Sequence, residues 1–309
     1  MDEAIVGEHE RRQINGQVQR ILRDLDNPEP PLKLEDVRQL LSLSLQYYRS
    51  TDPGLIAELT HRFNLLAKKS IPNMGRHLMS ALAKSKLCAF WVPDSARILL
   101  DEAEPVPKHR WMEAHEVAHS FTPWHRGFLL GDSKQSLDPT CHATLEAEAN
   151  YGAGRLIFLQ DRFGREAREL PFDFTSVKAL SQRYGNSIVS TCWRLVEERN
   201  PEQATFGLIS VHPHYDDIGS HDGTDPWRYF IRSQQFRLQF PHIEPAEIFG
   251  LVSRYATYRR TGPIVSAEVV LVDVTGRAFE FSVESFATRH AFMTMGGLIR
   301  VHAPAVALG

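Results

Sequence analysis

The sequence of 309 residues predicts an α+β fold, in which helices come first and most strands come last. Apolar residues recur at helical spacing through much of the first 200 residues, which favours helices there. Runs of β-branched and aromatic residues become frequent from about residue 203, which favours strands. A composition of 42% hydrophobic and 24% charged residues is that of a globular chain with enough material for about two domains.

The region before residue 170 is expected to hold helices around a small antiparallel sheet. Four segments have the apolar periodicity or the capping residues of helices: 13–25, 34–48, 50–67 and 73–84. Two short apolar runs, 87–92 and 96–100, flank a proline-containing turn and predict a β-hairpin. Segment 108–120 follows without glycine or proline and is expected to be a helix. Segment 121–140 contains two prolines and two glycines and is expected to be a loop or lid.

The chain after residue 170 is expected to form a helical linker and then a separate α/β domain. Residues 177–195 resemble a helix-turn-helix, with Gly185 at the turn and Ser187 opening the second helix, but they carry few side chains that read bases. Later segments predict four strands and one helix: strands over 205–211, 227–240, 267–274 and 277–283, and a helix over 245–258. The expected domains are therefore 1–170, 171–202 and 203–309.

The motif His115-Glu116-Val117-Ala118-His119 indicates the chemistry of the chain. Residues four apart share one face of a helix, so both imidazoles can bind the same metal ion. Glu116 is then placed beside that ion, free to take a proton from a bound water molecule. This arrangement is typical of a zinc hydrolase, with Zn2+ as the cofactor and Glu116 as the catalytic residue.

Two histidines and a water molecule leave tetrahedral zinc one protein ligand short, and two residues are candidates for that ligand. Glu146 lies on a segment whose apolar spacing predicts a second helix. His125 falls ten residues after His115, as in the metzincin pattern, although Thr122 replaces the glycine that this pattern needs. The residues alone leave both candidates open.

The motif helix and the run Glu146-Ala147-Glu148-Ala149-Asn150 together resemble the ImmA/IrrE family of metallo-endopeptidases. The resemblance implies a zinc-protease helix pair in which Glu146 is the third ligand. Asn150, one turn later, is then placed to accept a hydrogen bond from the far nitrogen of a ligand histidine. Glu148 is expected to be a solvated helix charge. The chain departs from the family after Asn150: many relatives carry an aromatic-Ala-Ala run there, whereas this chain has Tyr151-Gly152-Ala153-Gly154, which bears on the packing of the second helix.

The resemblance also implies a substrate class. Members of the family typically cleave a helix-turn-helix transcriptional repressor, so a protein of that kind is the expected partner, and some members carry a GAF-like sensor domain after the protease core. Four side chains are candidates for stabilising the oxyanion or contacting the substrate: His125, His142, Tyr151 and Arg155. The alternative is a non-catalytic zinc-fold regulator or toxin–antitoxin component that acts by binding, against which the intact Glu116 argues.

Charge and composition argue against several other classes of protein. A net charge of −3 gives no basic surplus, so direct binding to nucleic acid is not expected. The first residues are polar and acidic, without a signal peptide, and no apolar run is long enough to span a bilayer. A cytoplasmic protein with no membrane partner is therefore expected. The three widely spaced cysteines predict neither a disulfide framework nor a zinc knuckle.

Overall fold

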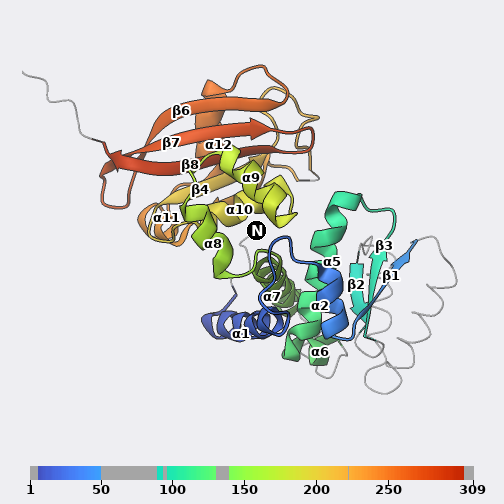
Figure 1. Ribbon diagram of the computed structural model, residues 1–309. Helices are drawn as coiled ribbons and strands as arrows, with labels where there is room; N and C mark the ends of the chain where they lie inside the picture. The colour runs from blue at the N-terminus through green and yellow to red at the C-terminus, as the bar shows by residue number, and fades with distance from the viewer. Residues whose placement is uncertain (1–5, 50–88, 93–95, 130–138, 222, 303–309) are drawn as a thin grey trace, which may run out of the picture. The chain divides into compact units, whose positions relative to one another are not determined.

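The computed structural model of the chain describes residues 6–49, 89–92, 96–129, 139–221 and 223–302 (Figure 1). The chain divides into two compact units, Met1–Gln160 and Asp161–Gly309, which we refer to as unit 1 and unit 2. Helices and strands occur in both, which confirms the predicted α+β class. The helices predicted over 50–67 and 73–84 lie outside the described residues.

The described part of unit 1 contains three long helices, and the last of them packs against the other two (Figure 1). These helices are α1 Glu8–Asp24, α5 Val106–Phe121 and α7 Pro139–Ile157. Gly152 on α7 lets this helix approach α5 and α1 closely. A Cβ atom placed there would lie 3.1 Å from Ala118 Cβ on α5 and 3.3 Å from Ile14 Cγ2 on α1. The glycine that departs from the family pattern thus lies where all three helices meet.

A three-stranded sheet packs beside α5, in the order β1-β3-β2. Its strands are β1 Ser44–Tyr48, β2 Ala89–Val92 and β3 Arg97–Asp101. The predicted hairpin is confirmed, since β2 and β3 are antiparallel with Ala89 opposite Leu100. The sheet is mixed, however, and not antiparallel throughout as predicted, because β1 pairs with β3 in parallel.

Two predictions for unit 1 are wrong in part. The helix predicted over 34–48 stops early: α2 covers Leu34–Leu40, and the chain turns through Ser42, at a φ of 56°, into β1. Backbone pairing with β3, some 50 residues later, outweighs the local helical pattern there. The loop predicted over 121–140 begins instead with a helix, α6 Pro123–Leu129, because a proline suits the first position of a helix.

Unit 2 is organised around a five-stranded antiparallel sheet in the order β5-β4-β8-β7-β6 (Figure 1). The strands are β4 Thr205–Ser210, β5 Trp227–Arg232, β6 Gly262–Val272, β7 Ala278–Ala287 and β8 Phe292–Val301. Helices α11 Gln234–Gln239 and α12 Pro245–Tyr255 lie between β5 and β6 in the chain. The strand predicted over 227–240 is therefore wrong in its second half, because the Ser233 hydroxyl accepts from the Phe236 N–H and starts α11. Strand β8 was not predicted.

Both faces of β4 are covered, so all its residues are buried. On one face, Phe206 packs against Phe236 of α11 and Phe281 of β7. On the other face, Gly207 lies against Val196 of α10 Ile188–Glu198. Alternate side chains of a strand point to opposite faces, so α11 and α10 pack on opposite sides of the sheet.

The helix-turn-helix-like segment belongs to unit 2. Helix α9 Phe174–Tyr184 ends at Gly185, which adopts the left-handed conformation, and the Ser187 hydroxyl accepts from the Ser190 N–H to start α10. Both helices pack on the sheet of unit 2, as α10 contacts β4 and α9 contacts β7. The boundary between the units falls before α8 Asp161–Arg168, whereas the sequence predicts boundaries at 170 and 202.

No helix in the described part of the chain is both long enough and apolar enough to cross a membrane.

Candidate metal centre

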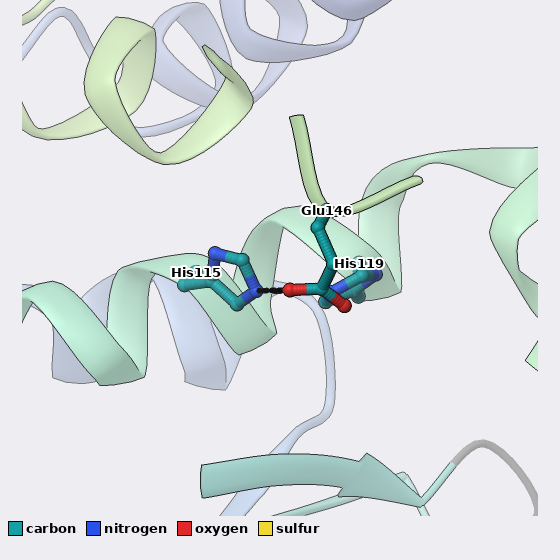
Figure 2. Close-up of side chains that lie close together, drawn as sticks. All are labelled: His115, His119 and Glu146. Carbon is teal, nitrogen blue, oxygen red and sulfur yellow. Dashed lines mark hydrogen bonds and ion pairs between the residues drawn. The ribbon is translucent and has the colours of Figure 1, made fainter. Parts of the chain in front are cut away.

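Three of the predicted site residues come together between α5 and α7: His115, His119 and Glu146 (Figure 2). Glu146 Oε2 lies 3.2 Å from His115 Nε2, and Glu146 Oε1 lies 3.6 Å from His119 Nε2. The two Nε2 atoms are 3.1 Å apart. One turn of α5 and one position on α7 therefore direct three metal-ligating atoms to a single point.

These distances fit one zinc ion. Zinc–nitrogen and zinc–oxygen bonds of about 2.0–2.2 Å in a tetrahedron place neighbouring ligand atoms about 3.3–3.6 Å apart. The His119–Glu146 separation of 3.6 Å falls in that range, and the His115–Glu146 and His115–His119 separations of 3.2 and 3.1 Å lie slightly below it. Two imidazoles and one carboxylate are also a donor set of catalytic zinc sites, which keep a fourth position open for water or substrate.

Asn150 lies beside the first of these ligands. Its Oδ1 is 3.0 Å from His115 Nδ1. An amide oxygen only accepts, so the hydrogen of the neutral imidazole is on Nδ1 and the lone pair on Nε2 faces Glu146. Asn150 is thus where the sequence predicted it, at the far nitrogen of a ligand histidine.

The pKa values of His119 and Glu146 suit metal binding. Burial lowers the pKa of His119 to about 4, which leaves a neutral imidazole at neutral pH. Burial raises the pKa of Glu146, but the imidazoles of His115 and His119 that face its oxygens outweigh burial and hold the pKa of this carboxyl well below its usual value. Near neutral pH, His119 and Glu146 are therefore both in the form that binds a cation.

Glu116 is buried beside the ligands, with 6% of its surface exposed. Burial raises its pKa to about 7, and the charge of Glu146 adds to the shift. The electrostatic effect of the neighbouring His115 ring and a hydrogen bond from the backbone of Trp91 on β2 oppose it. A carboxyl group with a pKa near neutrality can both take and release a proton at the working pH.

His125 does not join the three ligand atoms. Its Nδ1 lies 2.8 Å from Nδ1 of His119, on the side of that ring opposite the Nε2 that faces Glu146. The geometry therefore does not support the metzincin-like alternative, in which His125 is the third ligand. The side chain is fully buried and contacts His119 instead of converging with the three candidate ligand groups.

Glu148 contradicts its prediction as a solvated helix charge. Only 3% of its surface is exposed, and its Oε2 accepts hydrogen bonds from Trp124 Nε1 at 2.6 Å and from His125 Nε2 at 2.8 Å. The sequence did hold a signal for this. Glu148 falls three residues after Leu145 and next to Ala149, inside the buried stripe of α7, where a carboxylate must have partners.

The remaining predicted side chains have other surroundings. Tyr151 and Arg155 bond to Asn15 on α1: the Tyr151 hydroxyl lies 2.9 Å from Asn15 Nδ2, and Arg155 Nε donates to Asn15 Oδ1 at 3.0 Å. These bonds join α7 to α1 and not to α5, which carries both ligand histidines. The side chain of His142 lies outside the described part of the structure.

Comparisons with known proteins bear on the fold. No protein-family model matches the chain, and no curated protein matches it either. Among solved structures, the chain is similar to a Mycobacterium tuberculosis transcriptional regulator, with a TM-score of 0.54 and 11% identity. The similarity covers 93% of this chain and 75% of that chain. At this level of identity, the similarity establishes a shared fold and nothing further.

Proposed function

We propose that this chain is a zinc-dependent endopeptidase. The observation that carries the proposal is the convergence of His115, His119 and Glu146, whose ligand atoms all lie within 4.8 Å of one another, with Glu116 buried next to them. The ImmA/IrrE-like motif on α5 and α7 supports the same reading, since its functional positions are all occupied by matching residues.

The proposed reaction is hydrolysis of a peptide bond. Zinc held by His115, His119 and Glu146 would polarise the peptide carbonyl and make a water molecule in the fourth position more acidic. Glu116 takes a proton from that water as its oxygen forms a bond to the carbonyl carbon. Glu116 then gives the proton to the amide nitrogen as the carbon–nitrogen bond breaks, so the carboxylate is regenerated.

The proposed substrate is a protein, and the family resemblance points to a helix-turn-helix repressor. Strand β2 supports recognition of an extended segment, because it is an edge strand among the described residues of its sheet. The backbone of Trp91 on this strand bonds to Glu116, so a peptide paired along β2 would pass close to the proposed base. The proposal includes a cytoplasmic location, where such repressors act.

Incubation of the zinc-loaded protein with helix-turn-helix repressors encoded near its gene tests this proposal. The wild-type protein is expected to cut one of them, and Glu116→Gln is expected to cut it about 10²- to 10⁴-fold more slowly, because an amide cannot take the proton. Glu116→Gln should retain its zinc. Failure of the zinc-loaded wild type to cut any of them, together with an unchanged biological effect of Glu116→Gln, would favour a regulator that acts by binding.

A further inference from the structure

A buried chain of hydrogen bonds runs from His119 away from the metal position. His119 Nδ1 meets His125 Nδ1 at 2.8 Å, and His125 Nε2 meets Glu148 Oε2 at 2.8 Å. The exposed fractions are 4% for His119, 0% for His125 and 3% for Glu148. Trp124 Nε1 donates to the same oxygen of Glu148. Three elements contribute to this chain, since His119 lies on α5, His125 on α6 and Glu148 on α7.

The chemistry of the partners determines where the hydrogens lie. An ionised carboxylate only accepts, so His125 must carry a hydrogen on Nε2 to bond to Glu148. Neutral His125 then has a lone pair on Nδ1, and the hydrogen between the two rings must belong to Nδ1 of His119. Neutral His119 consequently has its lone pair on Nε2, the atom that lies 3.6 Å from Glu146.

We propose that His125 and Glu148 are positioning residues that fix the tautomer and the ring orientation of His119 for zinc. The inference rests on the zinc site of the proposed function and adds two residues to it. A carboxylate commonly orients a metal-bound histidine directly. Here a second histidine stands between them, so that Glu148 acts on His119 from across a whole imidazole ring.

The two ligand histidines are held in different ways. His115 bonds to the neutral amide of Asn150 at a contact open to solvent, whereas His119 bonds to a buried imidazole backed by a buried carboxylate. Water can replace a lost partner at the exposed contact but not at the buried one. Loss of His125 is therefore expected to weaken zinc binding more than loss of Asn150.

Imidazole nitrogen NMR on the metal-free protein tests the hydrogen positions without any reaction. His119 is expected to show a protonated Nδ1 and an unprotonated Nε2, and His125 the reverse pattern. A hydrogen on Nε2 of His119, with His125 protonated on both nitrogens, would overturn the proposal, because Nε2 of His119 would then have no lone pair to bind zinc.

Zinc affinity, measured by competition with a chelator, tests whether His125 and Glu148 strengthen zinc binding. His125→Phe keeps the ring volume but removes the acceptor, and it is expected to bind zinc about 10- to 100-fold more weakly than wild type. Glu148→Gln keeps one acceptor oxygen but loses the charge and the second acceptor, so its zinc affinity should lie between those of wild type and His125→Phe. His212→Phe, which replaces a fully buried histidine of unit 2, serves as the control and should bind like wild type.

The outcomes separate this inference from the proposed function. Wild-type affinity in folded His125→Phe and Glu148→Gln would overturn the positioning role whether or not the protein cuts peptides. Weakened binding in these variants, in a protein that cuts no peptide, would support the positioning role and count against the endopeptidase. If His125→Phe fails to fold, the affinity of Glu148→Gln and the NMR pattern of the wild type decide the matter.

Discussion

At the scale of single residues, burial of Glu116 links the chemistry of the site to the stability of the metal-free protein. Its pKa in the folded chain is about 7, above the ordinary value of a glutamate. The folded state therefore holds this proton at pH values where the unfolded chain has lost it. The stabilisation is complete below a pH of about 4.5 and is lost as the pH rises towards 7.

Glu116→Gln isolates this effect, because glutamine does not titrate. The free energy of unfolding of metal-free wild type, minus that of Glu116→Gln, is expected to fall by about 2–4 kcal/mol between pH 4.5 and 7.5. Urea denaturation across this range measures the difference, and taking the difference removes the opposing titration of His119. A difference that stays constant with pH would contradict the raised pKa.

The contact between Glu148 and His125 shows what could not be predicted about the site at this scale. His115, Glu116 and His119 are predictable because one turn of a helix contains them all. The contact between His125 and Glu148 joins two elements across 23 residues, and its formation depends on α6, which began inside a segment that we predicted to be a loop. Spacing along the chain predicts partners within an element far better than partners between elements.

At the scale of elements, the packing of α7 depends on the missing side chain of Gly152. A larger residue there would meet Ala118, Phe121 and Ile14, all of which are buried. Gly152→Val is expected to destabilise the protein by about 2–3 kcal/mol through overpacking.

Gly16 on α1 provides the matched control, because a Cβ atom placed there meets nothing within 4 Å. Gly16→Val should change stability by less than about 0.5 kcal/mol, since valine and glycine differ little in helix propensity. Thermal denaturation of both variants measures the two effects. Equal loss of stability in both would show that the approach of α7 to its neighbours does not depend on Gly152.

Helices α8 and α9 of unit 2 are joined by Glu166. Arg183 donates two hydrogen bonds to its carboxylate at 2.7 and 2.9 Å, and Arg162 and the Tyr184 hydroxyl donate one each at 3.0 Å. These bonds, that of Arg183 above all, lower the pKa of Glu166 to about 2. A lowered pKa stabilises the fold above a pH of about 4.5, and this stabilisation is lost as the pH falls towards 2.

Glu166→Gln should therefore flatten the acid side of the stability profile. The variant is expected to lose about 1–2 kcal/mol at neutral pH, after allowance for the solvent exposure of Arg183, and to approach wild type near pH 2. Denaturation monitored by tryptophan fluorescence at several pH values would measure this convergence. A stability loss that is the same at pH 3 and pH 7 would contradict the lowered pKa of Glu166.

The elements themselves were predictable where the pattern is local. The helix that carries the motif and the hairpin before it follow from apolar spacing and a turn. The local pattern predicts helix where β1 lies, because its parallel partner β3 lies some 50 residues later in the chain. The second half of the strand predicted over 227–240 failed for a different reason, since a single capping serine, Ser233, begins a helix there.

At the scale of the whole molecule, the order of helices and strands was predictable but the boundary between the units was not. Helices lie on both sides of Gln160 and Asp161, so composition does not change at the boundary. Contacts of α9 and α10 with the sheet of unit 2 place these helices in that unit. A GAF-like sensor role for unit 2 stays a prediction of the family resemblance.

The proposed zinc site lies entirely within unit 1, so removal of the metal should act there first. A chelator is expected to increase amide hydrogen exchange along α5 and α7, because zinc at about 1,000 times its Kd stabilises the folded state by about 4 kcal/mol. Strands β4 and β8 of unit 2 provide the internal control and should exchange at unchanged rates. Equal increases in both units, or none in α5 and α7, would contradict a site between these two helices.

The zinc content of the purified protein tests the central claim most directly. Elemental analysis is expected to find about one zinc per chain in wild type and in Glu116→Gln, which keeps all three ligands. His115→Ala and Glu146→Ala are expected to lose the metal or bind it much more weakly. Absence of zinc from the wild type, or full retention by Glu146→Ala, would contradict the site formed by His115, His119 and Glu146.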